Sequence, residues 1–405
     1  MKGSTALRVI GIISEYNPFH NGHAYQIDTL RRIYPDAVIA AIMSPNFVQR
    51  GEAALFDKYS RAHSAVLGGV DAVFSLPLVF ANLSAEGFAE AGVRLAHSLK
   101  IDTLSFGVEC DECKSLFEIA DLMLSDGFSE RVDKICASTP SLSLTRAIQK
   151  SIEEALGENA SKTVSQPNNI LALEYIKAIK RLKLPIDVLP IKREGEGYKS
   201  LKASPLPSAL LLRQKILQKE QICGLIPEAC GILYNELIAS GSFCDTEFFS
   251  KLLQSSLLLK TAEETERCFG SFELASKFRK QLLSSSSLDE AIDKTVGTRF
   301  TRTRIKRSVI SAFFGIAHNE FIHEEPKFTQ LLALSEKGRA HLSALRHSSF
   351  PIIVKNADAE KHEDYTSFKR QLDFEKAADR IWAQSQHRPC SPDIFMKKSP
   401  FVKGQ

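Results

Sequence analysis

The fold is decided by the stretch Val9-Ile10-Gly11-Ile12-Ile13-Ser14-Glu15-Tyr16-Asn17-Pro18-Phe19-His20-Asn21-Gly22-His23. Its first five residues are apolar or glycine, which is typical of a strand buried on both faces of a parallel sheet. The following residues form a loop, and residues 24–33 have the apolar spacing of a helix. A strand, a loop and a helix in this order predict the first unit of an α/β fold, in which ligands bind beyond the carboxyl ends of the strands.

The same alternation continues through the first half of the chain. Further buried strands are expected at residues 37–43, 71–76, 103–106 and 186–191. Helices are expected at residues 57–67, from a capping Ser84 to Leu99, at 169–182 and at 207–217. Continuous apolar strands separated by helices predict a Rossmann-like, doubly wound parallel sheet joined by right-handed crossovers.

After about residue 220 the pattern becomes mainly helical. Helices are expected at 246–258, 263–283 and 302–316, with a polar break at 284–287 and one short strand at 351–354. A chain of 405 residues is too long for one typical core. We therefore predict a Rossmann-like catalytic domain over residues 1–220 and a mainly helical domain over residues 221–405.

The composition is that of an ordinary globular protein, with 44% hydrophobic and 25% charged residues. No apolar run approaches the roughly 20 residues of a membrane helix, and the run near the N-terminus is too short for the core of a signal peptide. We expect a cytoplasmic protein without a membrane partner. The eight cysteines are scattered, and only Cys110 and Cys113 lie close together, so we expect neither disulfides nor a protein-bound metal.

The loop after the first strand carries the chemistry. His20 and His23 lie three residues apart at the mouth of a helix, where both imidazoles can face the same side. Gly22 lets a nucleotide approach the backbone, and the helix N-terminus offers unpaired N–H groups to phosphate. This pattern predicts a triphosphate site that stabilises charge at the α-phosphate. The alternatives are a zinc-binding pair and ordinary loop residues.

A second candidate site is a basic segment in the C-terminal half. Its cations are Arg299, Arg302, Arg304, Lys306 and Arg307, with no acidic residue among them. Such a segment is typical of contacts with the phosphates of a nucleic acid. The alternative is a solvated helix face.

Residues 11–23 closely resemble the signature of the bacterial tRNA(Met) cytidine acetate ligase family, within the wider HIGH-motif nucleotidyltransferase-like group. Further blocks match in the same order at residues 43–52, 166–177 and 300–305, so the resemblance spans most of the chain. The sequence departs from the family pattern in two places, at one residue and in one block. Lys199 stands where the family has histidine, and the block 206–213 keeps its serine and arginine but not its threonine or small residues.

The resemblance implies an ATP-dependent ligase that works in two steps. ATP and acetate give acetyl-adenylate and pyrophosphate, and the acetyl group then passes to N4 of the wobble cytidine of elongator methionine tRNA. An acyl phosphate anhydride is reactive enough for an aromatic amine, so no covalent enzyme nucleophile is needed. Magnesium is expected to arrive with ATP, and no DNA partner is expected.

The resemblance also implies the residues of the site, with His20 and His23 acting on the phosphates. The ATP site is expected to include Ile13, Ser14, Glu15, Tyr16, Asn17, Pro18, Phe19, His20, Asn21, Gly22, His23, Gln26, Gly107, Asn168, Asn169, Arg193 and Glu194. The asparagine pair has an alternative role as a helix N-cap, and Arg193 as a surface cation.

Other interpretations stay open from the sequence alone. Residues 46–52 could close over the acyl site, meet the RNA, or form an exposed loop. The chain as a whole could instead be a nucleotidyltransferase acting on a small metabolite, or a tRNA-binding protein whose active site has decayed. The basic segment favours an RNA substrate, and we expect Trp382 to lie in the core.

Overall fold

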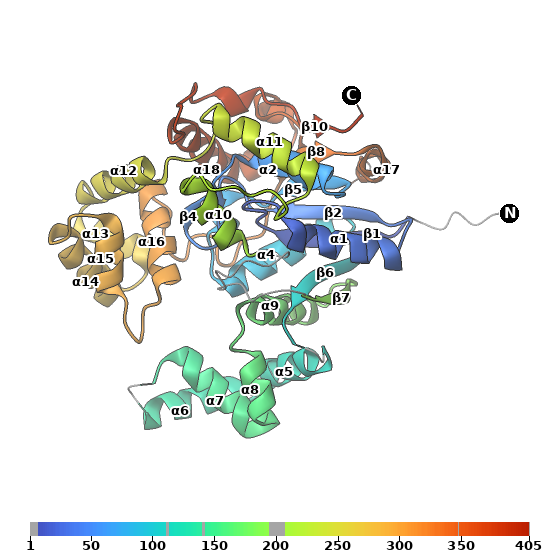
Figure 1. Ribbon diagram of the computed structural model, residues 1–405. Helices are drawn as coiled ribbons and strands as arrows, with labels where there is room; N and C mark the ends of the chain where they lie inside the picture. Colours follow the sequence, from blue (N-terminus) through green and yellow to red (C-terminus); the bar gives the residue numbers. More distant parts are fainter. Residues whose placement is uncertain (1–6, 111–112, 140–141, 194–206, 347, 405) are drawn as a thin grey trace.

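The expected first strand is β1 (Val9–Ser14), and it lies inside an eight-stranded sheet (Figure 1). The computed structural model describes residues 7–110, 113–139, 142–193, 207–346 and 348–404. The main path of the sheet is β10-β8-β5-β2-β1-β6-β7, and β9 pairs with β8. The other strands are β2 (Val38–Met43), β5 (Ala72–Ser75), β6 (Thr103–Val108), β7 (Asp187–Lys192), β8 (Thr329–Leu334), β9 (Ile352–Ile353) and β10 (Phe401–Val402).

The strand order reverses at β1. After β1 the chain adds β2 and β5 on one side, and it then crosses to add β6 and β7 on the other side. All these pairings are parallel, so the carboxyl ends of the strands lie along one edge of the sheet. A reversal of this kind opens a crevice between the two innermost strands. The predicted site loop leaves β1 at this crevice.

Both faces of the sheet are covered. Ile10 and Ile12 pack on one face with helices α1 (Asn21–Ile33) and α2 (Lys58–Leu67). Val9 and Ile13, which alternate with them, pack on the other face with helices α4 (Ala85–Ser98) and α9 (Pro167–Leu182). This arrangement explains why the strands are apolar without interruption.

The C-terminal half contributes to the same sheet. Strand β8 pairs with the edge of β5 in antiparallel orientation, so the expectation of a purely parallel sheet is wrong at this edge. β10 and β9 then pair with β8 in parallel. The expected strand at 351–354 is confirmed as β9, whereas β8 and β10 were not predicted. The sheet thus crosses residue 220, and the division into two domains there stays a prediction.

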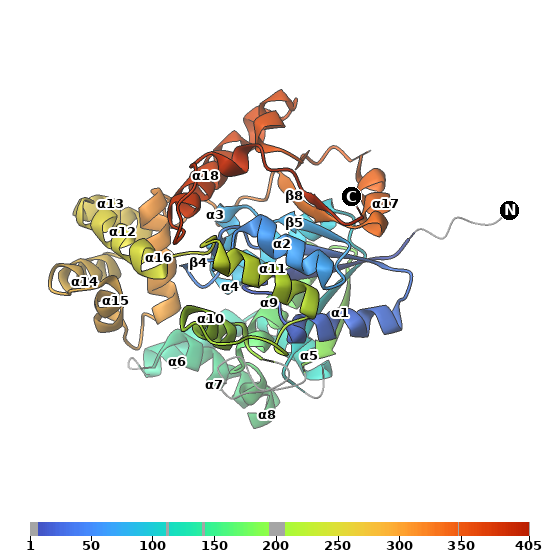
Figure 2. The ribbon, with the colours of Figure 1, turned by 45° about the horizontal axis from the view of Figure 1, so that its top comes forward.

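Two groups of helices form lobes beside the sheet (Figures 1 and 2). One lobe, between β6 and α9, consists of α5 (Lys114–Leu124), α6 (Phe128–Ser138), α7 (Leu144–Leu156) and α8 (Glu158–Thr163). The other consists of α12 (Thr246–Leu258), α13 (Ala262–Phe269), α14 (Phe272–Leu283), α15 (Leu288–Thr295) and α16 (Arg302–Phe314). The single helix expected at 263–283 is wrong, because Gly270 adopts a left-handed φ of 67° and ends α13.

The remaining helices lie closer to the sheet. They are the short α3 (Leu78–Ala81), α10 (Ala209–Leu217), α11 (Glu228–Ala239), α17 (Glu336–Leu345), α18 (Tyr365–Gln384) and two 3-10 turns, Asn356–Lys361 and Ile394–Met396. Trp382 on α18 is fully buried, as expected, and donates to the Ala54 carbonyl at 2.8 Å. Within the described ranges, no helix combines the length and apolar character needed to cross a bilayer.

A buried ionic cluster joins α18 to the sheet. The Lys58 ammonium lies 2.7 Å from Glu375 Oε1 and 2.9 Å from Asp379 Oδ2, and it donates to Gln330 of β8 at 2.6 Å. Burial raises the pKa of Asp379, and Lys58 opposes that shift. The cluster contains two acidic groups and one cation. The Lys58 ammonium therefore offsets the free-energy cost of burying both carboxylates.

We predict that Lys58→Met destabilises the protein by about 3–5 kcal/mol, because it leaves buried carboxylates without a counter-charge. The free energy of unfolding from urea titration measures this loss. Lys294→Met is the matched control, since Lys294 forms an exposed ion pair with Glu290 and should cost about 0–1 kcal/mol. Equal losses in the two variants would contradict the role given to the cluster.

Candidate active site

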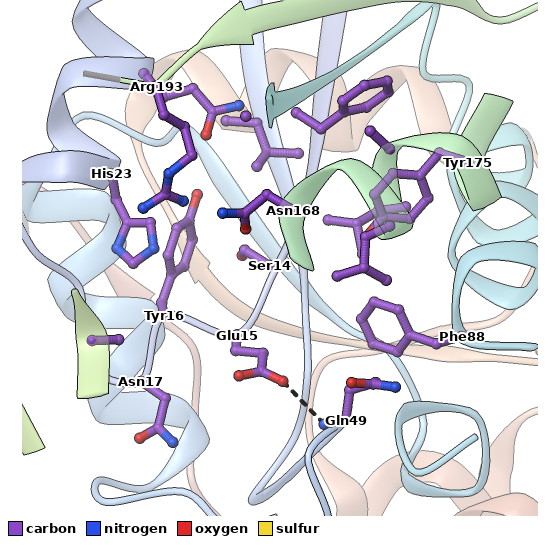
Figure 3. A pocket seen from close by; sticks show the side chains of 18 of the residues that line it. Ser14, Glu15, Tyr16, Asn17, His23, Gln49, Phe88, Asn168, Tyr175 and Arg193 are labelled. Atoms are coloured by element: carbon purple, nitrogen blue, oxygen red, sulfur yellow. Dashed lines mark hydrogen bonds between the residues drawn. The ribbon is translucent and has the colours of Figure 1, made fainter. Parts of the chain in front are cut away.

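A pocket lies at the crevice where the strand order reverses (Figure 3). It is bounded by the end of β1, the end of β6, the start of α1, the start of α9 and the start of α10. Among the expected nucleotide residues, its lining includes Ile13, Ser14, Glu15, Tyr16, Asn17, His20, His23, Gln26, Gly107, Asn168 and Arg193. The structure therefore brings together residues from four separate parts of the sequence.

The two histidines fix each other and the start of α1. His20 is the N-cap, and its Nδ1 accepts a hydrogen bond from Gly22 N at 3.0 Å. His23 Nδ1 in turn accepts from His20 N at 3.2 Å. The two rings stack with centroids 3.7 Å apart. A side chain at residue 22 would meet the His20 ring at 2.9 Å, so the glycine gives this imidazole its room.

These contacts determine which nitrogen carries the proton. Because Nδ1 of each neutral ring accepts a hydrogen bond, the hydrogen of each ring must be on Nε2. Burial lowers the pKa of His20 to about 3, with Arg193 and Arg213 adding to the effect. Burial, His20 and Arg193 lower the pKa of His23 well below its ordinary value. At neutral pH the pair therefore offers two Nε2–H donors rather than two fixed charges.

The residues just before this pair have buried polar atoms that are poorly satisfied among the described residues. The side-chain amide nitrogen of Asn17 has no partner, and the hydroxyls of Ser14 and Tyr16 have no partner other than each other. Tyr16 is only 1% exposed and adopts a left-handed φ of 45°, a strained conformation for a residue with a side chain. Buried polar groups are normally paired, so these atoms fit a ligand with polar groups of its own.

Gly107 and Arg193 lie against each other at the ends of β6 and β7. A Cβ at residue 107 would come within 3.0 Å of Arg193 Cγ. The glycine thus leaves room for the arginine stem as well as for a ligand. In Figure 3 the Arg193 guanidinium lies beside His23 and Tyr16 in the pocket. Arg193 therefore lines the pocket and is not a simple surface cation.

The two asparagines at the start of α9 have different environments. Asn168 lines the pocket, and its amide nitrogen donates to the Glu109 carboxylate. Asn169 is fully buried: its Oδ1 accepts from Glu109 N at 2.9 Å, and its Nδ2 donates to Gln166 Oε1 at 2.6 Å. The structure brings only Asn168 to the pocket, and Asn169 holds the turn that positions it.

Some expected residues support the loop without lining the pocket. Phe19 is fully buried and packs on Gly68, and the side chain of Asn21 donates to the Gly224 carbonyl at 2.8 Å. Pro18, which follows a cis peptide bond, and Gly22 are likewise absent from the lining. Glu194 and Lys199 lie outside the described residues.

A second helix N-terminus, that of α10, also borders the pocket. Ser208 caps α10 by accepting from Leu211 N at 3.2 Å, and Ala209 at the helix start lines the pocket. Arg213, one turn later, donates to the Asn17 carbonyl at 2.8 Å. The block that departs from the family pattern therefore still places a helix N-terminus and an arginine beside the loop after β1.

Arg61 of α2 holds the strand ends together and was not predicted. Its buried guanidinium donates to the backbone carbonyls of Glu15 at 2.6 Å, Phe56 at 2.9 Å, Ser44 at 3.1 Å and Pro45. Burial lowers the pKa of Arg61 to about 10. The only signal in the sequence was a cation at a position of α2 that is in phase with buried alanines, such as Ala65 four residues later.

Residues 46–53 form a hairpin of β3 (Phe47–Val48), which is buried, and β4 (Glu52–Ala53), which is half-buried, so the alternative of an exposed loop is wrong. The turn places Gln49 and Arg50 in the pocket lining, and neither was predicted there. Gly51 has a φ of 72°, and a Cβ there would come within 2.5 Å of the α16 backbone. The hairpin thus connects the pocket to the helix that carries most of the basic segment.

The cations of the basic segment differ in their partners. Arg299 pairs with Glu273 at 3.1 Å, Lys306 with Glu52 at 2.7 Å, and Arg302 with Asp289 at 2.6 Å and also with Asp293. Among the described residues, Arg304 and Arg307 have no acidic partner. Arg304 lies over the Phe300 ring, and burial and Arg304 lower the pKa of Arg307 to about 10.

Other lining residues were not predicted either. Phe88 of α4 and Tyr175 of α9 lie across the pocket from the loop (Figure 3), and Phe106 of β6 packs on Tyr175 with ring centroids 5.5 Å apart. In the sequence they belong to ordinary apolar helix and strand patterns, which do not distinguish a pocket wall from a core position. Among the described residues, no three histidine, cysteine or acidic side chains lie together in a group that could hold a metal ion.

Comparison with known proteins identifies the family. The model of the HIGH nucleotidyl transferases matches residues 7–393. A tRNA(Met) cytidine acetate ligase of Caldanaerobacter subterraneus subsp. tengcongensis is 33% identical over 90% of this chain and 93% of its own length. One from Ligilactobacillus salivarius is 30% identical over 90% of this chain and 95% of its own length.

Solved structures agree with these sequence relatives. The apo structure of Thermotoga maritima TmcAL has a TM-score of 0.90 to this chain at 26% identity, covering 98% of this chain and 99% of that one. A second structure of the same protein, bound with alpha-thio ATP, has a TM-score of 0.88 over the same shares. This chain therefore belongs to the HIGH nucleotidyl transferase family and, within it, to the tRNA(Met) cytidine acetate ligases.

Proposed function

We propose that this protein joins acetate to N4 of the wobble cytidine of elongator methionine tRNA, through acetyl-adenylate formed from ATP. The observation that carries this proposal is the convergence of His20, His23 and Arg193 at the crevice where the strand order reverses. The family relatives bear the name of this activity.

The first step suits the phosphate side of the pocket. The N-termini of α1 and α10 and the Nε2–H groups of His20 and His23 supply donors, and Arg193 supplies a positive charge. A carboxylate oxygen of acetate attacks the α-phosphorus, and the bond to the bridging oxygen of pyrophosphate breaks. Donors already in place stabilise the charge that builds on the phosphates during this displacement.

In the second step the amine nitrogen attacks the acyl carbon, and AMP leaves with the electron pair of the broken carbon–oxygen bond. The amine loses one proton. We infer that the N-terminal part of the chain, residues 1–220, carries this chemistry and that residues 221–405 supply the tRNA contacts. Arg304 and Arg307 are best suited to phosphates, because they have no acidic partner among the described residues.

Magnesium fits this scheme as a companion of ATP. The phosphate side of the pocket is lined by histidines and Arg193, whereas magnesium prefers oxygen ligands and usually binds through substrate phosphates. Both proposed substrates, ATP and tRNA, belong to the cytoplasm. We infer that the protein acts there on RNA rather than on DNA.

The reaction itself is the first test. Methionine tRNA incubated with the protein, ATP and isotopically labelled acetate should gain one acetyl group on the wobble cytidine, detected by mass spectrometry of the digested RNA. Pyrophosphate exchange into ATP should require acetate, because the adenylate forms before the transfer. Exchange driven by a phosphorylated metabolite and indifferent to acetate would instead support a small-molecule nucleotidyltransferase.

His20→Ala should lower the acetate-dependent exchange rate by about 100- to 1,000-fold, the usual effect of removing one transition-state donor. It also removes the cap of α1, so thermal unfolding should be measured alongside. His97→Ala, at the exposed end of α4, is the matched control and should exchange at the wild-type rate. Full exchange activity in the His20 variant would contradict the assignment.

Arg304→Ala should weaken tRNA binding and reduce the slope of log affinity against log salt concentration by about 1, as expected for one lost phosphate contact. Arg302→Ala is the matched control on the same helix, because two carboxylates already neutralise that cation. Filter binding at several salt concentrations measures both slopes. Equal changes in the two variants would argue against a specific role for Arg304.

A further inference from the structure

Glu15 is the only carboxylate among the described residues that line the pocket. It is the third residue of the stretch, beginning at Ile13, that the family resemblance assigns to ATP. In Figure 3 its side chain points away from His23 and Arg193, toward Gln49 and Phe88. The carboxylate therefore lies on the side of the pocket opposite the phosphate donors.

The chemistry of the three reactants restricts what Glu15 can bind. A carboxylate is an acceptor of hydrogen bonds and carries negative charge. The triphosphate and acetate are both anions, and a carboxylate repels them. An aromatic amine is neutral and has two N–H donors, so its charge and hydrogen-bonding pattern are complementary to those of Glu15.

The surroundings keep this carboxylate in place. Its Oε1 accepts from Gln49 N at 3.1 Å, and the Glu15 backbone carbonyl accepts from Arg61 at 2.6 Å. Burial raises the pKa of Glu15, and the charges of Arg50 and Arg213 oppose that rise. A carboxylate can accept about four hydrogen bonds, so the bond from Gln49 leaves acceptor capacity for a ligand.

We propose, on the basis of the function proposed above, that Glu15 accepts a hydrogen bond from the exocyclic amine of the target nucleobase and takes its proton during acyl transfer. The nitrogen–carbon bond forms while the bond between the acyl carbon and the AMP oxygen breaks. AMP keeps the electron pair, and the amine proton moves to a Glu15 oxygen. Proton, charge and bonds then balance without a further reactant.

This role places Glu15 in the second step only. Phe88 and Tyr175 lie across the pocket from it, where a flat base can pack against aromatic rings. The hairpin residue Gln49 is bonded to the same carboxylate, so the hairpin and the end of β1 form this wall together. A residue that binds only the acceptor should leave adenylate formation intact.

Glu15→Gln tests the proposal, because it keeps the size of the side chain and removes the base. Two rates are compared: acetate-dependent pyrophosphate exchange, and single-turnover acetyl transfer to methionine tRNA. We expect transfer to fall by about 100-fold or more, the usual contribution of a general base, while exchange stays near the wild-type rate. The tRNA dissociation constant, measured by filter binding, should change little. Glu15→Asp should recover part of the transfer rate.

Glu90→Gln is the matched control, since Glu90 pairs with Arg94 and Arg181 on the outside of α4 and should leave both rates unchanged. A parallel fall of exchange and transfer in Glu15→Gln, or a higher KM for ATP in exchange, would overturn the proposal by placing Glu15 on the nucleotide. Unchanged transfer would also overturn it. Wild-type protein without acetate-dependent exchange would remove the proposed function, and this role with it.

Discussion

The active site depends on a single buried guanidinium, that of Arg61. A guanidinium without water must donate its hydrogens to protein acceptors, and here the acceptors are backbone carbonyls. They belong to the loop after β1, to the loop after β2 and to the approach to α2. This requirement fixes two strand ends relative to one helix. Glu15 and Tyr16 are consequently positioned by a residue that does not line the pocket.

Helix α2 carries a second buried cation, and the two have separate effects. Arg61 organises the carboxyl ends of neighbouring strands near the pocket, whereas Lys58 connects the sheet to α18 through Glu375 and Asp379. The Arg61 contacts join segments that are close in the sequence, whereas the Lys58 contacts join parts of the chain more than 300 residues apart. We therefore expect the loss of Lys58 to destabilise the whole fold, whereas Arg61 determines where the strand ends at the site lie.

The sequence predicted the centre of the fold better than its edge. The five parallel strands are mostly short apolar runs separated by stretches with helical spacing, and such patterns are local. β8 is equally apolar, but its pairing with β5 depends on a contact between distant segments that no local pattern encodes. The break at Gly270 was visible as a glycine, but the helical apolar spacing continues across it.

At the candidate site, too, some residues could be predicted from the sequence and others could not. The His20–His23 loop could be found because its residue types and spacing are unusual for a structural loop. Arg61, Gln49 and Phe88 could not, because each belongs to an ordinary helix or loop pattern and gains its role only when the chain folds. For the asparagine pair, the sequence identified the right block, but only the structure separates Asn168 at the pocket from Asn169 in the turn.

The antiparallel pairing of β8 with β5 has a consequence for synthesis of the protein. The Thr329 hydroxyl of β8 donates to the carbonyl of Ser75, the last residue of β5, 254 residues earlier in the chain. At ribosomal rates of about 5–20 residues per second, β5 emerges roughly 13–50 s before its partner. During that interval its apolar edge has no partner strand and is open to pairing with other chains. The nascent N-terminal half thus passes through an aggregation-prone state that ends only when β8 has left the ribosome.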